Sequence, residues 1–200
     1  MIKQKAYKFR LCPNFEQRVL FEKTFGCARF IWNQMLADRI THYEKTGTSL
    51  NNTPAQYKKD FPWLKEVDSL SLCNVQLNLN KAFKSFYQSG FGFPNFKTKK
   101  TAQSYKTNSQ KGLITILDGR VKLPKVGWVK LKLHRQVRGL IKSATISKTS
   151  TGKYFISILC EEEMSLLPKT DSNLGIDLGL ENFAILSTGA VSYTHLTLPT

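Results

Sequence analysis

Acidic residues are scarce where this sequence is most basic. Residues 81–153 contain seventeen of the thirty Lys and Arg of the chain, and Asp118 is their one acid. An ordinary solvated basic face is diluted by Glu and Asp, whereas this stretch is not. We therefore predict a polyanionic partner for the middle third. Nucleic acid is favoured over an anionic membrane surface because no amphipathic helix carries these lysines.

Clustered cysteines, long apolar runs and a signal peptide are also missing. The four cysteines stand far apart, with no CxxC pair and no His at ligand spacing; they are Cys12, Cys27, Cys73 and Cys160. This pattern predicts buried or idle thiols in a reducing cytoplasm rather than a zinc site. No run of about 18 apolar residues occurs, and the charged start lacks an apolar signal core, so we expect no membrane partner.

Helical spacing of apolar residues follows the first strand signal. We predict two helices, over residues 13–26 and 27–45, separated at Gly26 and with Phe15 and Val19 in the core. Two helices that meet at a glycine resemble a helix-turn-helix. As evidence for a DNA reader this is weak, because most such pairs simply pack together.

A third helix is expected from Asp68 or Ser69, either of which can cap it, to Gly90. One face of this helix is apolar, and the opposite face carries polar side chains, namely Asn74, Asn78, Lys81, Lys84 and Gln88. Such a face either reads base edges or is simply exposed to solvent, and the two interpretations are equally weighted.

Short alternating runs predict an antiparallel sheet. The runs are residues 2–11, 113–117, 120–123, 128–133, 143–148 and 154–160. We expect a small barrel closed by the N-terminal strand, with residues 161–163 in a linker. Lys130 and Lys132 fall on one face, near Arg135, Arg138 and Lys142. We interpret this basic stripe as a groove that follows phosphates, in preference to a solvated sheet face.

The stretch Leu174–Thr188, LGIDLGLENFAILST, reads as a strand, a turn and a second strand, with Asp177 inside the first strand. A carboxylate in a buried strand is costly unless a charged group meets it. Asp177 is therefore either a solvated residue at a strand end or the first acidic ligand of a ribonuclease-H-like site. That fold also serves sugar kinases and actin-like ATPases, so the motif alone does not fix the chemistry.

Five stretches together resemble the TnpB/OrfB family of bacterial insertion-sequence proteins, relatives of the type V CRISPR nucleases. They are KAYKFRLCPN, GCARFIWNQMLADRI, FPNFKTKK, RVKLPKVGWVKLKL and GIDLGLENFAILSTG, in the family's order. The resemblance implies an RNA-guided DNA endonuclease that cuts beside a short flanking motif, with guide RNA and target DNA as partners. It also implies a cytoplasmic, nucleoid-associated protein of a bacterium or archaeon, with no implied oligomeric state.

The resemblance also implies site residues. Asp177 matches the family's first RuvC carboxylate, a ligand of Mg²⁺ or Mn²⁺ in a two-metal site of the complete protein. Ser69, Cys73 and Asn74 are expected to read the flanking motif, although Cys73 stands where family members often have Gln. The expected nucleic-acid-binding residues are Lys81, Lys84, Lys97, Lys99, Lys100, Lys106, Lys130, Lys132, Arg135, Arg138 and Lys142.

The expected fold class is α+β, a split antiparallel wedge-like β-barrel with a helical recognition insert, followed by the first β-hairpin of a RuvC domain. The corresponding ranges are 1–12 for the first barrel strand, 13–89 for the insert, 90–166 for the basic strands and 167–189 for the start of RuvC. Residues 190–200 are expected to be a non-native tail, because VSYTHLTLPT matches the translation of a sequencing-library adapter; a divergent third strand is the alternative interpretation.

We accordingly expect a truncated, inactive chain, since the family's later carboxylates and zinc-ribbon cysteines have no counterparts in it. A stand-alone nucleic-acid-binding protein remains the alternative. An actin-like ATPase is a third interpretation, and it leaves the basic middle unexplained.

Overall fold

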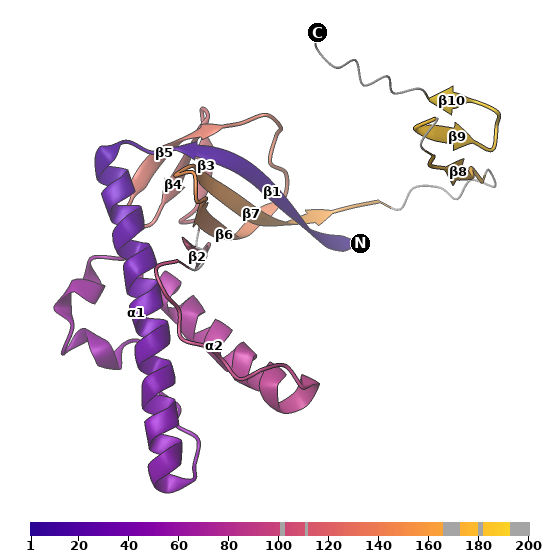
Figure 1. Cartoon of the computed structure of the whole chain (residues 1–200). Helices are drawn as coiled ribbons and strands as arrows, with labels where there is room; N and C mark the ends of the chain where they lie inside the picture. The colour runs from indigo at the N-terminus through magenta and orange to yellow at the C-terminus, as the bar shows by residue number, and fades with distance from the viewer. Residues whose placement is uncertain (101–102, 111, 166–172, 180–181, 193–200) are drawn as a thin grey trace. The chain divides into compact units, whose positions relative to one another are not determined.

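The computed structural model describes residues 1–100, 103–110, 112–165, 173–179 and 182–192. The chain divides into two compact units, Met1–Met164 and Ser165–Thr200, and each is considered by itself (Figure 1). Most of the predicted adapter-derived tail, residues 193–200, lies outside the described residues, as do Asp171 and Glu181, the acidic residues nearest to Asp177 in the sequence.

The first unit is built on a curled, seven-stranded antiparallel sheet in the order β2-β6-β7-β1-β5-β4-β3 (Figure 1). The strands are β1 Ile2–Cys12, β2 Gln103–Asn108, β3 Thr115–Leu117, β4 Arg120–Leu123, β5 Gly127–Lys132, β6 Leu140–Lys148 and β7 Tyr154–Glu163. The N-terminal strand therefore lies in the middle of an open sheet, between β7 and β5. The predicted antiparallel sheet is confirmed as a curled half-barrel, which stays open because β2 and β3 form two separate edges.

Turn chemistry explains why most strands were predictable. Asp118 and Gly119 both have positive φ, 47° and 67°, as a two-residue type I′ hairpin turn requires between β3 and β4.

Residues 161–163 were expected to be a linker, but they extend β7 and pair with Ile2–Gln4 of β1. Period-two alternation is weak there because all three side chains are glutamates, and pairing with β1 decides the conformation instead. The edge strand β2 was not predicted at all.

A single helix, α1 Phe15–Thr46, replaces the two helices predicted around Gly26. A capping box starts it: Gln17 N–H donates to Asn14 Oδ1 over 2.8 Å, and Asn14 N–H donates to Gln17 Oε1 over 3.1 Å. A glycine inside a helix costs only about 0.5–1 kcal/mol, and the buried residues on both sides of Gly26 keep the helix continuous. Phe15, at 79% exposure, and Val19 lie outside the core, contrary to prediction.

The second helix, α2 Ser69–Ser89, begins and ends as predicted, with Asp68 as N-cap and Gly90 in the left-handed region. One carboxylate oxygen of Asp68 accepts from Leu70 N–H, and the other accepts from the Thr107 hydroxyl. Asp68 therefore fixes the start of α2 to β2. Leu72 and Leu79 on this helix are fully buried.

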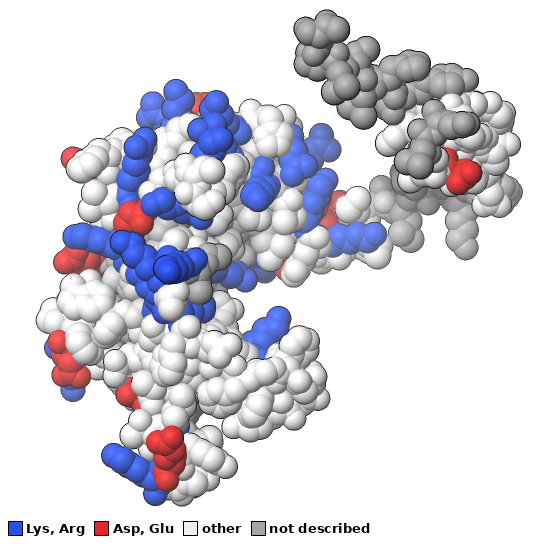
Figure 2. Space-filling model, in the orientation of Figure 1, with Lys and Arg blue, Asp and Glu red and all other residues white. Residues whose placement is uncertain are grey.

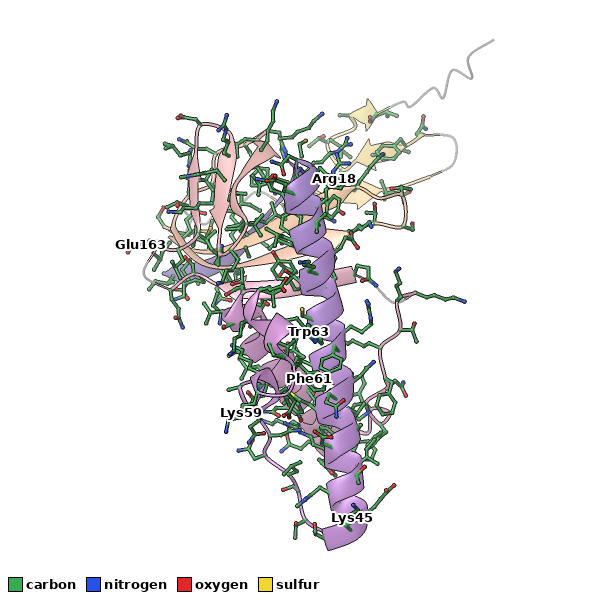
Figure 3. All side chains as sticks on the ribbon, turned by 90° about the vertical axis from the view of Figure 1, so that its left-hand side faces the viewer. Arg18, Lys45, Lys59, Phe61, Trp63 and Glu163 are labelled. Atoms are coloured by element: carbon green, nitrogen blue, oxygen red, sulfur yellow. The ribbon has the colours of Figure 1, made fainter. Side chains whose placement is uncertain are left out.

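Two short 3₁₀ helices, η1 Gln56–Lys58 and η2 Pro62–Lys65, join α1 to α2. Phe30 of α1 lies 4.7 Å from the Phe61 ring and 4.9 Å from the Trp63 ring, centroid to centroid (Figure 3). This edge-to-face cluster holds the connection against α1.

One core is shared by the inner face of the sheet and the helices. Phe21 of α1 lies 5.6 Å from Tyr154 of β7, and Phe25 lies 5.7 Å from Tyr105 of β2. The inner face of β1 contributes Tyr7, Phe9 and Leu11, as the alternation predicted. The opposite, outer face of β1 and β5 is exposed and carries mostly polar side chains.

The described residues of the second unit form three short strands in the order β10-β9-β8: β8 Ile176–Asp177, β9 Ala184–Leu186 and β10 Val191–Ser192. The predicted hairpin is present as β8 and β9, with Asp177 opposite Ile185. Its assignment to a RuvC domain stays a prediction. In the described part of the chain, no helix combines the length and apolar character needed to cross a membrane.

Candidate nucleic-acid interface

Cations from three neighbouring strands share the outer face of the sheet. Lys130 and Lys132 alternate with buried Val129 and Leu131 in β5, so their side chains leave the face opposite the core. In the register of the sheet, Arg10 of β1 lies opposite Lys132. Arg120 of β4 likewise lies opposite Lys130. We call these four exposed residues, Arg10, Arg120, Lys130 and Lys132, the outer basic rows.

Like charges face each other directly in both rows. Such cross-strand pairs are destabilising, whereas opposite charges in the same positions would be favourable. Among the described residues, no ion pair joins the outer basic rows to a carboxylate. The arrangement therefore suits an external polyanion, since phosphates placed between the side chains would relieve the repulsion.

Aromatic rings lie among these cations. Phe155 of β7 is opposite Arg10 in the register, and Lys8 Nζ lies 5.2 Å from the centroid of its ring. An open hollow of about 610 Å³ is lined by Phe155 together with Lys8, Arg10 and Lys132, among others. Trp128, at 40% exposure, lies on the same face two residues before Lys130. Cations interleaved with aromatic rings can hold phosphates and stack bases.

The charge distribution is visible on the molecular surface. In the view of Figure 2, Lys and Arg gather over the sheet, whereas the C-terminal end of α2 is almost free of charged side chains. The basic character that composition assigned to residues 81–153 is thus concentrated on particular elements of the first unit.

Three predicted residues do not join the outer basic rows. Arg135 lies 5.2 Å from the ring centroid of Tyr7, whose side chain belongs to the inner face. Lys142 forms an ion pair with Glu161 at 3.2 Å. Arg138 is exposed in the connection between β5 and β6. The predicted stripe is therefore divided, with Lys130 and Lys132 on one face and Arg135 on the other side.

A second basic region surrounds the segment before β2. Asn33 of α1 fixes this segment, because its amide donates to Lys97 O over 2.9 Å and its carbonyl accepts from Lys97 N–H over 2.8 Å. Trp32 Nε1–H donates to Asn95 O over 3.0 Å. Lys97 Nζ lies 3.8 Å from the Trp32 ring centroid, and burial lowers the pKa of this lysine.

A hollow of about 230 Å³ between α1, α2 and β2 brings several predicted residues together. Asn74, Lys97 and Lys106 line it, along with Asn78. Asn74 is itself buried, and its amide donates to Leu70 O over 2.8 Å.

The other predicted residues of this region are exposed. Ser69 lies at the start of α2 and accepts from Lys58 Nζ over 2.8 Å. Cys73, Lys81 and Lys84 are exposed further along α2, and Lys99 and Lys100 are exposed in the segment before β2. Their role in reading a DNA motif or contacting RNA stays a prediction.

Asp177 is exposed on β8. Ser187 bridges the hairpin next to it, because its backbone N–H donates to Gly175 O over 2.8 Å and its hydroxyl accepts from Gly175 N–H over 2.9 Å. Across the residues that the structure describes, no group of three or more His, Cys, Asp or Glu could hold a metal ion. A two-metal site needs several carboxylates, so the described residues alone do not fit that group.

Sequence reasoning missed Arg10, Arg120 and Phe155. The alternation of β1 already placed Arg10 on an outer face, which was the available signal. What the sequence did not contain was the strand order that sets Arg10 beside Lys132.

Comparisons with known proteins agree with the family resemblance. A helix-turn-helix domain family of the OrfB/IS605 type matches residues 1–48. In the structure this range is a strand followed by one long helix.

The chain is 30% identical over 199 residues to a protein of Escherichia coli K12 provisionally named RNA-guided DNA endonuclease InsQ, covering 96% of the chain and 49% of that protein. A provisionally named RNA-guided DNA endonuclease of Streptomyces pristinaespiralis is 29% identical over 198 residues, covering 93% and 48%. Virulence protein VsdF of Salmonella dublin is 29% identical over 113 residues, covering 48% and 93%. The chain thus spans about half the length of the first two relatives.

Proposed function

Because the chain belongs to the TnpB/OrfB family, we propose that its first unit binds RNA, and the DNA paired with it, mainly through phosphates. The outer basic rows carry this proposal. Two directly opposed like-charge pairs persist there without a carboxylate partner among the described residues. A folded sheet gains nothing from that repulsion, whereas a polyanion binds more tightly because of it.

Recognition through the backbone fits the division of labour in RNA-guided nucleases. There, base pairing with the guide carries sequence specificity, and the protein holds the heteroduplex through its geometry and charge. The outer basic rows supply point charges and forked guanidinium groups, both of which bind phosphate. Asparagines and lysines around the hollow between α1, α2 and β2 are proposed to contact the flanking DNA motif.

We assign Asp177 to the chemistry rather than to nucleic-acid binding. By the family resemblance it provides one carboxylate of a two-metal site that cleaves DNA, together with acids that this unit does not supply among its described residues. If the chain is instead a stand-alone nucleic-acid-binding protein, the same prediction holds for the sheet, and the two hypotheses differ only in the role of Asp177.

Salt dependence tests the proposal. Replacing Arg10, Lys130 and Lys132 together with Ala should weaken binding to unrelated RNAs to a similar extent. It should also reduce the slope of log affinity against log salt by about 2. Three exposed lysines outside the sheet serve as the matched control: replacing Lys45, Lys59 and Lys65 together with Ala should change neither quantity much (Figure 3 labels Lys45 and Lys59). Equal losses in both variants would reduce the effect to net charge and contradict a dedicated surface.

A further inference from the structure

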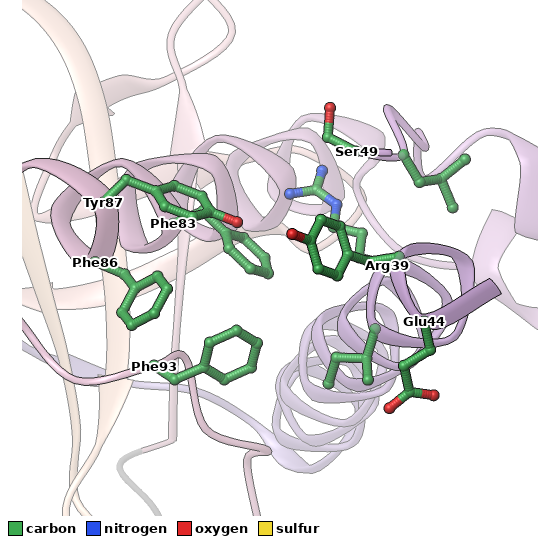
Figure 4. A pocket seen from close by; sticks show the side chains of 10 residues that line it. Arg39, Glu44, Ser49, Phe83, Phe86, Tyr87 and Phe93 are labelled. Atoms are coloured by element: carbon green, nitrogen blue, oxygen red, sulfur yellow. The ribbon is translucent and has the colours of Figure 1, made fainter. Parts of the chain in front are cut away.

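The C-terminal halves of α1 and α2, together with the segment that follows α2, enclose a hollow of about 460 Å³ (Figure 4). Half of its ten lining residues are aromatic, namely Tyr43, Phe83, Phe86, Tyr87 and Phe93. Four of these rings, all but that of Tyr43, meet in stacked, tilted and edge-to-face contacts; Phe86 and Phe93, for example, have centroids 5.3 Å apart. We call this feature the aromatic hollow.

Arg39 is held rigidly at the wall of the aromatic hollow. Its Nε–H donates to Asn52 Oδ1 and its Nη2 group donates to Asn80 Oδ1, both over 2.8 Å. Its guanidinium carbon lies 5.5 Å from the ring centroid of Phe83. Asn52 is fixed in turn, because its amide donates to the Tyr57 hydroxyl over 2.8 Å. Three parts of the chain therefore cooperate to position one guanidinium group.

In the described part of the chain, no ion pair joins Arg39 to a carboxylate, and the two oxygens that accept hydrogen bonds from it, Asn52 Oδ1 and Asn80 Oδ1, belong to neutral amides. Glu44 lines the same hollow, but no ion pair joins its carboxylate to Arg39. Burial also lowers the pKa of Arg39, which reflects its partial loss of water.

This unpaired charge decides which occupant fits. An apolar side chain of a protein partner would take more water from the guanidinium and give it no acceptor, which is costly. A nucleobase presents a flat π-face to the rings, and its carbonyl oxygens and ring nitrogens can accept from Arg39. Unpaired bases are commonly bound by such combinations of aromatic and guanidinium groups.

We propose that the aromatic hollow binds one unpaired nucleotide of the bound RNA or DNA, with its base stacked on Tyr87 or Phe93 and its acceptor atoms facing Arg39. This inference rests on the nucleic-acid binding proposed above. It adds a preference for single-stranded segments, which the outer basic rows do not provide because phosphates are common to single strands and duplexes.

The test compares binding of the full chain to one RNA oligonucleotide, single-stranded or annealed to its complement, by fluorescence anisotropy. Tyr87→Ala combined with Phe93→Ala should weaken single-strand binding about tenfold and change duplex binding less than twofold. Phe91→Ala combined with Leu77→Ala is the matched control, because both side chains are exposed and neither lines the hollow. If the double variant does not fold, Tyr87→Ala alone suffices, since Tyr87 is 70% exposed, and it should weaken single-strand binding several-fold.

Three results would overturn the inference. Unchanged single-strand affinity, or equal losses for both forms of RNA, would remove the nucleotide from the hollow. A free chain that sediments as a dimer, and as a monomer after Tyr87→Ala and Phe93→Ala with RNA affinity unchanged, would identify a second copy as the occupant. Failure of the wild-type chain to bind either RNA would overturn the proposed function as well. If RNA binding depends on salt but is unchanged by the substitutions in the aromatic hollow, this inference fails and the proposed function is retained.

Discussion

Removing positive charge from the outer basic rows should stabilise the protein while impairing its binding. Lys130→Gln combined with Lys132→Gln keeps an uncharged polar side chain at each position and abolishes both like-charge pairs, with Arg120 and Arg10. A directly opposed pair contributes about 0.2–1 kcal/mol, and these exposed side chains are partly screened at physiological salt. The two pairs together predict a gain of about 0.5–1 kcal/mol in the free energy of unfolding.

Urea unfolding and thermal unfolding would both detect this gain. For a chain of this length, about 0.5–1 kcal/mol corresponds to an increase of about 1–4 °C in Tm. The same variant should bind RNA more weakly, with a salt slope reduced by about 1–2. Low salt should enlarge the gain in stability, because the repulsion is then less screened. Lys45→Gln with Lys59→Gln is the control and should affect neither stability nor RNA affinity appreciably.

Opposite signs of the two effects are the informative feature. Substituting a residue that supports the fold lowers the stability of the protein, whereas substituting a residue that serves binding can raise it. If the double variant is destabilised, the lysine stems contribute packing that outweighs the repulsion. If RNA affinity is unchanged, the rows are a solvated sheet face, and the proposed interface is wrong.

Three further outcomes follow from particular residues. Gly26→Ala should raise the free energy of unfolding by up to about 1 kcal/mol, because the added Cβ would meet nothing within 4 Å and α1 is continuous there. A lower free energy of unfolding, measured in urea, would instead indicate a break in the helix at this position. Burial alone would raise the pKa of Glu22, but hydrogen bonds from Lys148 and Tyr154 bring it below its ordinary value. The stabilisation that ionised Glu22 provides is therefore present at pH values above its ordinary pKa and is lost as the pH falls through the pKa of the folded state. Glu22→Gln should accordingly make the free energy of unfolding depend less on pH in the acid range. Asp177→Asn should leave the RNA affinity of this chain unchanged and should abolish cleavage in a protein that carries the remaining acids; cleavage retained there would exclude it from the metal site.

Local chemistry explains what could be predicted from sequence. The faces of β1 and β5 follow from strict alternation, and Asp68 and Gly90 bound α2 because each suits its capping position. Gly26 misled the prediction, because a helix-breaking residue has a small cost compared with burying the apolar stripe around it.

Features that depend on non-local pairing could not be predicted. The sheet order sets Arg10 beside Lys132 and leaves the barrel open, and no periodicity encodes that order. Arg135 follows β5 closely in sequence, yet its loop directs it to Tyr7 on the other side. The aromatic hollow was missed for the same reason, because Asn52 and Asn80 that fix Arg39 come from separate segments.

The separation of charges between the two units has a chemical rationale. The outer basic rows and the aromatic hollow belong to Met1–Met164, whereas Asp177 belongs to Ser165–Thr200. In the sequence of that second range, Lys169 is the one Lys or Arg. A lysine close to metal-binding carboxylates would repel a divalent cation and form ion pairs with its ligands. A surface that binds phosphates needs the opposite composition, because carboxylates would neutralise it. If the proposed phosphate-binding surface and the proposed metal site belong to different units, each can keep the charge that its chemistry requires, and a substitution at Asp177 should leave RNA binding intact.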